Sequence, residues 1–454
     1  MAGSGAHATI GPMPIRRRRA ARPIGLLIAT ALVGAFTGGC GSPVPSPSAA
    51  PTPSPTISGG SQSPSPPSSG DPNAAVFAEI QAQVVELRGL EPRRPVTPTL
   101  LTREELGDLL RAAIEEGSPP ELLAAYERLY RGMGLMAADV SLATLFGDLV
   151  ESQAGGLYVP ADESLYVVSE AGELGPIERV LFAHEFGHAL QDQHFDLEAI
   201  QEGLTDQTDR QLARQALIEG DAYVLNTRWM LEHLSPAELS ELIAQASDPE
   251  LLAALDDIPP IVQSAFLFAA THGTQWVLGV QGRGGWSAVD ALWTRLPEST
   301  EQILHPEKYE SNELPIEVVV PDGLADGLGA GWSALLEDTF GEHQLSIWLS
   351  GDEAPNGIIP TLPEDAAEAA AGWGGDRVVV LGGPNDETAI VLTTEWDSAD
   401  DAGEFAERAE MAIDELGVLG VVVHQPGSRT ATVLIGSDVD VVRALDQLLG
   451  VTGI

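Results

Sequence analysis

The spacing of apolar residues divides the chain into a helical stretch, a short alternating stretch and a longer mixed stretch. From residue 75 to residue 153, apolar residues recur every three or four positions, which predicts amphipathic helices. Thr102 followed by Glu105 has the sequence of a capping box, which marks the beginning of one of them. These predicted helices cover 75–90, 102–117, 120–134 and 141–153.

After residue 153 the spacing of apolar residues shortens to every second position. GGLYVPADESLYVVSE (155–170) alternates apolar and polar residues around a central group of turn formers, which predicts a β-hairpin. Helical spacing returns directly after the hairpin. The predicted helices of this stretch cover 176–197, 210–231, 264–280 and 286–296, and a short one lies in 299–310.

Beyond about residue 322, helical and strand patterns follow one another. GWSALLEDTFGEHQLSIWLSG (331–351) has helical spacing, and further helices are predicted over 399–417 and 438–450. Short β-branched runs predict strands over 376–383, 387–396, 420–425 and 430–436. We therefore expect an α+β, mostly helical protein, with one domain over 76–322 and a small α+β region over 323–454.

The first residues have the pattern of an export signal. A basic run (15–22) precedes a short apolar stretch, and small residues stand immediately before Cys40. This arrangement resembles a bacterial lipoprotein signal peptide over 1–39, which implies a lipid on Cys40. Thr37 departs from the resemblance, because such signals usually carry an aliphatic residue there. An uncleaved N-terminal membrane anchor is the alternative.

Residues 40–75 consist mainly of Pro, Ser, Gly and Thr and predict a disordered tether. With a lipid or an anchor before it, we expect the folded part at the extracytoplasmic face of the cell membrane. The net charge of −44 argues against a nucleic-acid partner, because such a surface repels phosphate. The single cysteine excludes a disulfide within one chain.

The strongest chemical signal is HEFGH (184–188) in the predicted helix 176–197. His184 and His188 are four residues apart, so both imidazoles point from one face of a helix and can bind the same Zn²⁺. Glu185 lies beside such a metal, where it can take a proton from zinc-bound water. The motif predicts a hydrolytic site with one Zn²⁺ per chain.

His194 and Glu219 are the two candidates for the third ligand of the metal. The spacing of His194 matches that of the metzincins, but Gln191 stands where they carry a helix-breaking Gly. On a continuing helix, His194 lies about 240° around the axis from His188 and faces away. Glu219, in ALIEGDA (216–222), is the other candidate, and Gly220 beside it permits close approach of another helix. We expect Glu219 to bind the metal, with His194 as the alternative.

HEFGHALQDQHFDL and ALIEGDA together resemble zincin metallopeptidases, and more narrowly a group of largely uncharacterised bacterial zinc-peptidase-like lipoproteins. Two His plus a Glu from the next helix is the gluzincin arrangement. The resemblance implies hydrolysis of a peptide or protein substrate, and an edge strand above the metal, for which LYVVS (165–169) is the candidate.

Supporting residues are less certain from sequence alone. Asp221 suits a role in orienting a ligating imidazole through its other N–H. His272 is our candidate for stabilising the oxyanion, and Tyr223, His305 and Tyr309 are alternatives.

Two other functions stay open at this point. The chain can be a non-catalytic surface lipoprotein whose zinc is structural and which acts in binding or assembly. A site closed by both His194 and Glu219 would favour this function, because four protein ligands leave no position for water. Alternatively, the region after residue 322 is a binding module for a substrate or partner.

Overall fold

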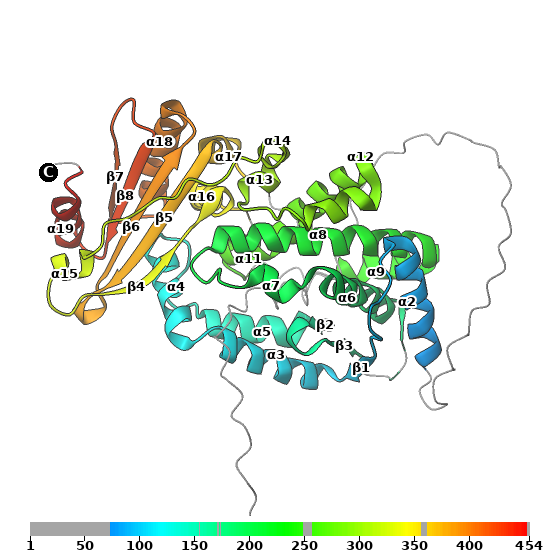
Figure 1. Ribbon diagram of the computed structural model, residues 1–454. Coiled ribbons are helices and arrows are strands. Elements are labelled where there is room, and N and C mark those ends of the chain that lie inside the picture. The colour runs from blue at the N-terminus through cyan, green and yellow to red at the C-terminus, as the bar shows by residue number, and fades with distance from the viewer. Residues whose placement is uncertain are drawn as a thin grey trace, which may run out of the picture.

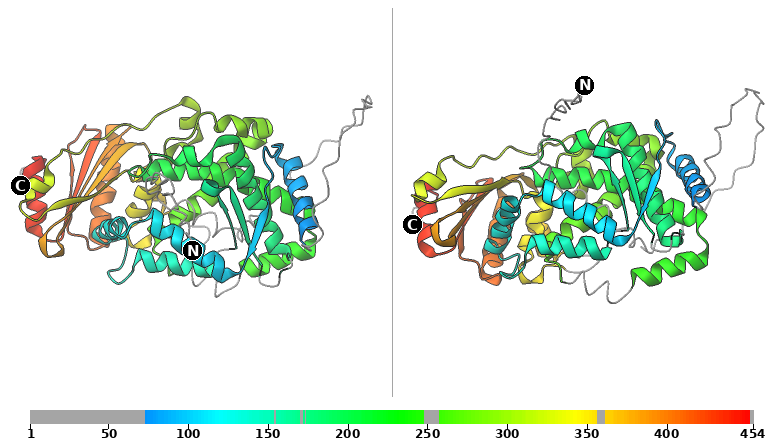
Figure 2. Two further views of the ribbon diagram at one scale, coloured as in Figure 1. Left: turned by 60° about the horizontal axis from the view of Figure 1, so that its bottom comes forward. Right: turned by 90° about the horizontal axis from the view of Figure 1, so that it is seen from below.

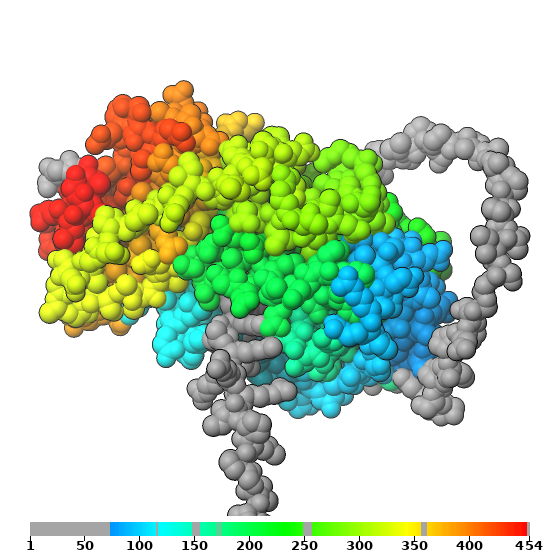
Figure 3. All heavy atoms as spheres, viewed as in Figure 1, coloured from blue at the N-terminus to red at the C-terminus, as the bar shows by residue number. Residues whose placement is uncertain are grey.

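The computed structural model describes residues 73–153, 155–169, 172, 174–247, 257–355 and 361–451. These residues form a mostly helical part and, at one end of it, a part built on a five-stranded sheet (Figures 1 and 2). In Figure 3 the blue N-terminal helix and the red C-terminal helix lie at opposite ends of the molecule. The expected α+β, mostly helical class is confirmed.

The predicted signal peptide, Cys40 and all but the end of the predicted tether lie outside the described residues. The tether was predicted to reach residue 75, whereas the first helix already begins at Ala74. No helix among the described residues combines the length and the apolar character needed to cross a membrane.

The first helices follow the predicted pattern closely. The capping box is present, because the Thr102 side chain accepts from the Glu105 backbone N–H and the Glu105 carboxylate accepts from the Thr102 backbone N–H. The helices are α2 (Ala74–Arg88), α3 (Arg103–Gly117), α4 (Pro120–Gly132) and α5 (Leu142–Gln153).

The predicted hairpin is present, but it belongs to a three-stranded sheet. β2 (Gly156–Val159) and β3 (Ser164–Val168) are antiparallel, and β1 (Pro98–Leu101) pairs with β3 in parallel. The order is therefore β1-β3-β2. The assignment of LYVVS (165–169) as an edge strand was wrong, because β1 occupies the other side of β3. Among the described strands, β1 and β2 form the two edges of this sheet.

Two long helices cross the centre of the helical part. They are α6 (Pro176–Phe195), which carries the HEFGH motif, and α8 (Thr208–His233), which carries ALIEGDA. The other helices of this part are α7 (Leu197–Gln201), α9 (Pro236–Ala246), α11 (Pro260–Phe268), the π-helix η2 (Ala269–Gly273), α12 (Thr274–Leu292), α13 (Glu301–Leu304) and α14 (Pro306–Ser311).

Glycines permit a close approach between α8 and η2. A Cβ on Gly220 would lie 2.4 Å from the backbone oxygen of Gly273, and a Cβ on Gly273 would lie 2.3 Å from that of Ala216. The expectation that Gly220 admits a neighbouring helix is confirmed. This contact fixes the position of α8 immediately beside Glu219.

The C-terminal part contains the strands and helices predicted after residue 375, together with two short helices, α15 (Leu324–Leu328) and α17 (Glu364–Ala370), that were not predicted. Residues 331–351 are not one helix: β4 (Ser333–Asp338) is followed by α16 (Gly341–Leu349), and Gly341, the first residue of α16, has a φ of 76°. The other elements are β5 (Trp373–Gly382), β6 (Thr388–Trp396), α18 (Ala399–Glu415), β7 (Gly420–His424), β8 (Thr430–Gly436) and α19 (Val439–Leu449).

The sheet of this part has the order β4-β5-β6-β8-β7, and all its neighbouring strands are antiparallel. Helices α16, α17 and α18, together with α4 from the helical part, cover one face. Helices α15 and α19 cover the other face. Because α4 shares a core with the sheet, the two parts form one continuous structure.

Candidate metal centre

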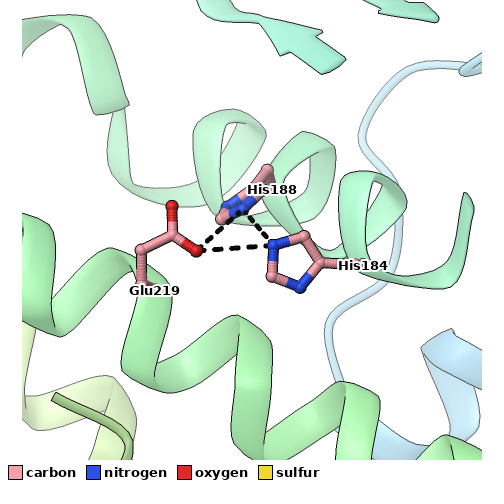
Figure 4. Close-up of side chains that lie close together, drawn as sticks. All are labelled: His184, His188 and Glu219. Atoms are coloured by element: carbon pink, nitrogen blue, oxygen red, sulfur yellow. Dashed lines mark hydrogen bonds and ion pairs between the residues drawn. The ribbon is translucent and has the colours of Figure 1, made fainter. Parts of the chain in front are cut away.

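Helices α6 and α8 bring three potential metal ligands together (Figure 4). The two Nε2 atoms of His184 and His188 are 3.1 Å apart, and the Oε2 atom of Glu219 lies 3.4 Å and 3.6 Å from them. All three side chains are buried. The spacing of four residues places the imidazoles on one face of α6, as predicted, and α8 supplies the carboxylate from the opposite side.

The electrostatics of the three groups are coupled. Burial alone lowers the pKa of His188, but the carboxylates of Glu219 and Glu185 and the side chain of Gln191 outweigh it and raise that pKa to about 9. For His184 burial dominates and the pKa is lowered. Burial would raise the pKa of Glu219, but the two histidines lower it to about 2. The pocket therefore favours an anionic carboxylate that requires a nearby positive charge.

The donor set fits a divalent cation. Two imidazole nitrogens and one carboxylate oxygen are common zinc ligands, and these atoms all lie within 4.8 Å of one another. Oε2 of Glu219 has no hydrogen-bond partner, although it is fully buried. The two histidine Nε2 atoms lie 3.4 Å and 3.6 Å from it without forming a hydrogen bond, and a metal bound between the three side chains would compensate its buried charge directly.

Polar side chains orient two of these ligands. Oε1 of Gln191 lies 2.8 Å from Nδ1 of His188. The amide nitrogen of Gln191 donates to the backbone oxygen of Ile218 on α8. Gln215 donates to Oε1 of Glu219 at 2.8 Å, one helical turn away. These two glutamines hold the ligand side chains in position, a role that the sequence analysis gave to neither.

Asp221 does not orient a histidine, so that prediction was wrong. Its two carboxylate oxygens accept from the guanidinium of Arg88 at 2.8 Å each, and Trp293 donates to one of them. The reason is the phase of the helix, because two residues beyond Glu219 correspond to about 200° around the axis. Asp221 therefore faces α2 and α12, away from the ligands.

Glu185 lies against strand β2. The backbone N–H of Tyr158 donates to Oε2 of Glu185 at 2.7 Å, while Oε1 is buried and has no partner. A Cβ on Gly156 would lie 3.1 Å from Cγ of Glu185, so a glycine permits this close packing. Burial raises the pKa of Glu185 to about 8, opposed by His188 and by the Tyr158 N–H. A carboxyl group with this pKa can gain and lose a proton near neutral pH.

Tyr223 also belongs to the site. Its ring centroid lies 4.8 Å from that of His184, and its hydroxyl is buried without a hydrogen-bond partner. Burial and the charges of Glu219 and Glu185 raise its pKa well above the usual value, so the hydroxyl keeps its proton and can donate it in a hydrogen bond. Tyr223 follows Glu219 by four residues, a spacing that could have selected it from the alternatives.

The other candidate residues lie elsewhere. His194 is near the end of α6, and its Nε2 lies 2.8 Å from the backbone oxygen of Glu91. His272, on η2, stacks on Phe268 and lies beside His343. His305 pairs with Glu342, and the Tyr309 hydroxyl donates to the backbone oxygen of Arg295. The structure groups none of these four with His184, His188 and Glu219.

A second group of acidic side chains has a simpler explanation. Glu301, Glu313 and Asp397 converge, but the ammonium group of Lys308 lies among them, 2.5 Å from Glu301 and 2.9 Å from Glu313, and also pairs with Asp397. The lysine supplies the positive charge that the three carboxylates require. We therefore treat this cluster as an ion-pair network.

Comparison with known proteins gives little functional information. A family model for a domain of unknown function (DUF8575) matches residues 333–447, from the beginning of β4 into α19. A crystal structure from Chloroflexus aurantiacus, described as "a putative hydrolase with a novel fold", matches with 19% identity and a TM-score of 0.32. That match covers 54% of this chain and 92% of the other. No curated protein matches the chain.

Proposed function

We propose that the protein is a zinc-dependent peptide hydrolase with a gluzincin-like site. One observation carries the proposal: three protein ligands converge, and a partnerless carboxylate oxygen of Glu185 lies beside them. Catalytic zinc sites have three protein ligands and a free position, whereas structural sites have four. His194, which would have closed the site, lies apart from the group.

His184, His188 and Glu219 would hold the ion. A bound zinc ion supplies a Lewis acid that polarises a carbonyl group and makes water more acidic. Glu185 then acts as the base. The Tyr158 N–H fixes one of its oxygens, which leaves Oε1 to accept a proton from the attacking water and to pass it to the leaving amine.

Tyr223 takes the role that the sequence analysis gave to His272. Its buried hydroxyl has no competing acceptor and lies in the field of both carboxylates. A donor in this position can stabilise the negative charge that develops on the carbonyl oxygen of a substrate. His272 packs between aromatic rings and is not placed for this role.

Strand β2 is suited to hold an extended peptide. Among the strands that the structure describes, β3 alone pairs with it, and its Tyr158 N–H donates to Glu185. A peptide that pairs with this edge would lie along the base, beside the contact between Glu185 and the Tyr158 N–H. This assignment replaces LYVVS (165–169) as the substrate-binding edge.

We further propose that the chain is a lipoprotein anchored through Cys40 to the extracytoplasmic face of the cell membrane. The basic and apolar pattern before Cys40 and the Pro/Ser-rich segment after it support this location. Mass spectrometry of the membrane-extracted protein tests the proposal. A diacylglycerol adduct on Cys40 supports it, and an unmodified N-terminal segment contradicts it.

Zinc stoichiometry and peptide hydrolysis together test the enzyme proposal. The wild-type protein and His194→Ala should bind one zinc ion, whereas Glu219→Ala should lose it. Glu185→Gln should keep the zinc and lose hydrolysis, by about 10²–10⁴-fold if the residue acts as a general base. Zinc bound in Glu185→Gln with unchanged turnover would refute the mechanism. Zinc that raises the melting temperature, with no peptide cleaved by the wild type, would favour the structural-zinc alternative.

A further inference from the structure

A pocket opens beside the metal centre, between helices α4, α5, α8, α11 and α16. Its volume is about 160 Å³. Apolar side chains form most of its wall, and the half-buried ones among them include Leu122 and Leu123 on α4, Phe146 on α5 and Phe266 on α11. None of the described residues that line it is charged. Of the residues that line it, the metal centre described above uses Gln215.

The pocket and the metal centre lie along the same face of α8. Thr208, Gln211, Leu212 and Gln215 line the pocket, and Glu219 is the next residue on this face, four positions later. Gln215 belongs to both the pocket and the metal centre. Its amide nitrogen donates to Glu219, and its Oε1 is buried without a hydrogen-bond partner. The stretch of α8 that lines the pocket therefore ends about one helical turn, roughly 5–6 Å, before Glu219.

The size and polarity of the pocket define what it can hold. A dry protein cavity of about 150 Å³ lined by Leu, Ile and Phe is known to bind benzene, so this pocket has room for one aromatic or branched aliphatic side chain. A charged side chain would lose its hydration without gaining a partner. The unpartnered Gln215 oxygen at the inner end can accept from a backbone N–H of the same ligand.

We propose that this pocket binds a phenylalanine- or leucine-sized side chain of the peptide substrate, next to the bond that is cleaved. The assignment of the occupant to a substrate rests on the proposed hydrolase function. The preference for a neutral apolar group rests on the pocket alone. The protein should therefore prefer peptides with such a residue at one fixed position relative to the cleavage site, by at least about tenfold over alanine.

Ala265→Trp is the variant that tests the pocket. Ala265, on α11, is half-buried and lines the wall, so an indole there would fill the space. Ala237→Trp on α9 is the matched control, because Ala237 is exposed and lies outside the pocket. Thermal melting and zinc stoichiometry of both variants show whether each has folded with an intact metal centre.

The first measurement is binding, which does not depend on hydrolysis. N-acetyl-phenylalanine amide and N-acetyl-alanine amide are titrated into the full folded chain and followed by NMR. The phenylalanine amide should bind at least about tenfold more tightly to the wild type and to Ala237→Trp. Ala265→Trp should lose this difference. Equal binding of both amides to the wild type, or unchanged selectivity in Ala265→Trp, would overturn the assignment.

The second measurement is kcat/KM of the zinc-loaded protein on peptides that differ only in Phe, Leu or Ala at one position. Ala265→Trp should lower kcat/KM for the Phe and Leu peptides to near the Ala value. If no peptide is cleaved but the binding difference is present and lost in Ala265→Trp, the hydrolase function fails and the apolar pocket stands. If peptides are cleaved without discrimination, the pocket assignment fails and the hydrolase function stands.

Discussion

Replacing Gly220 by Ala tests the contact between α8 and η2, because it adds one methyl group at that contact. In Gly220→Ala the new Cβ would lie 2.4 Å from the Gly273 oxygen, 2.6 Å from the Gly273 carbonyl carbon and 2.8 Å from the Val277 side chain. The nearest two atoms belong to the backbone, so no rotation of a side chain can relieve the overlap. The helices must move apart or the helix must distort.

The size of this movement follows from the distances. To reach an ordinary contact of about 3.4 Å from 2.4 Å, the two segments must separate by about 1.0 Å. Overpacking of this kind costs about 1–3 kcal/mol, which exceeds the gain of about 1 kcal/mol from replacing Gly by Ala in a helix. Glu219 adjoins Gly220, and metal–ligand distances tolerate only about 0.2 Å, so zinc affinity should fall by tenfold or more.

Gly282→Ala provides the matched control. Gly282 lies in α12, is exposed, and has no atom within 4 Å of the position of a new Cβ. Here helix propensity acts alone, so the variant should be more stable by up to about 1 kcal/mol and should bind zinc normally. Urea unfolding and a competitive zinc titration measure both quantities. If Gly220→Ala matches Gly282→Ala in stability and zinc affinity, the close approach of α8 and η2 is incorrect.

Three further variants test other parts of the structure. Asp221→Asn should cost about 1–3 kcal/mol in urea unfolding, because the buried guanidinium of Arg88 loses one of its two anionic partners and keeps Asp290. It should leave zinc stoichiometry unchanged, and loss of zinc would restore Asp221 as an orienting residue. Tyr223→Phe should keep zinc and lower kcat by about 10²–10³-fold, and an unchanged kcat would exclude the hydroxyl as a donor. Burial raises the pKa of Asp376 from about 3.8 to about 6, so the folded protein binds more protons than the unfolded chain between these values. The stabilising contribution of Asp376 is therefore full below pH 3.8 and is lost as the pH rises through 6. The stability of the wild type relative to Asp376→Asn should fall by about 3 kcal/mol across this range in urea unfolding, and a constant or rising difference would contradict the pKa shift.

The parts of the fold that follow from local pattern were predicted well. The helices of the first half and the strands after residue 372 begin and end within a few residues of their predicted bounds. The pairing of strands was not predictable in the same way. β1 (Pro98–Leu101) is four residues long, begins with proline and shows no alternation, so nothing local revealed a third strand beside the hairpin. The error about the substrate-binding edge followed from that omission.

The candidate metal ligands show the same limit of sequence-based prediction. The geometry of His184 and His188 is set within one helix, so their spacing was sufficient. The position of His194 was predictable for the same reason, since α6 continues past Gln191 to Phe195. The neighbours of a ligand depend on which helix packs against which. Gln191 bonds to His188 and to the backbone of α8, a contact visible only once the two helices are placed.

The C-terminal part supports the metal centre from a distance. Asp338, at the end of β4, accepts from the backbone N–H and the hydroxyl of Thr208, the first residue of α8. Asp209, the next residue, accepts from the backbone N–H of Thr300. A carboxylate at the beginning of a helix satisfies its free N–H groups and interacts favourably with its dipole, so β4 fixes the beginning of the helix that carries Glu219. A strand of the matched domain of unknown function thus helps to position the third ligand of the proposed hydrolase.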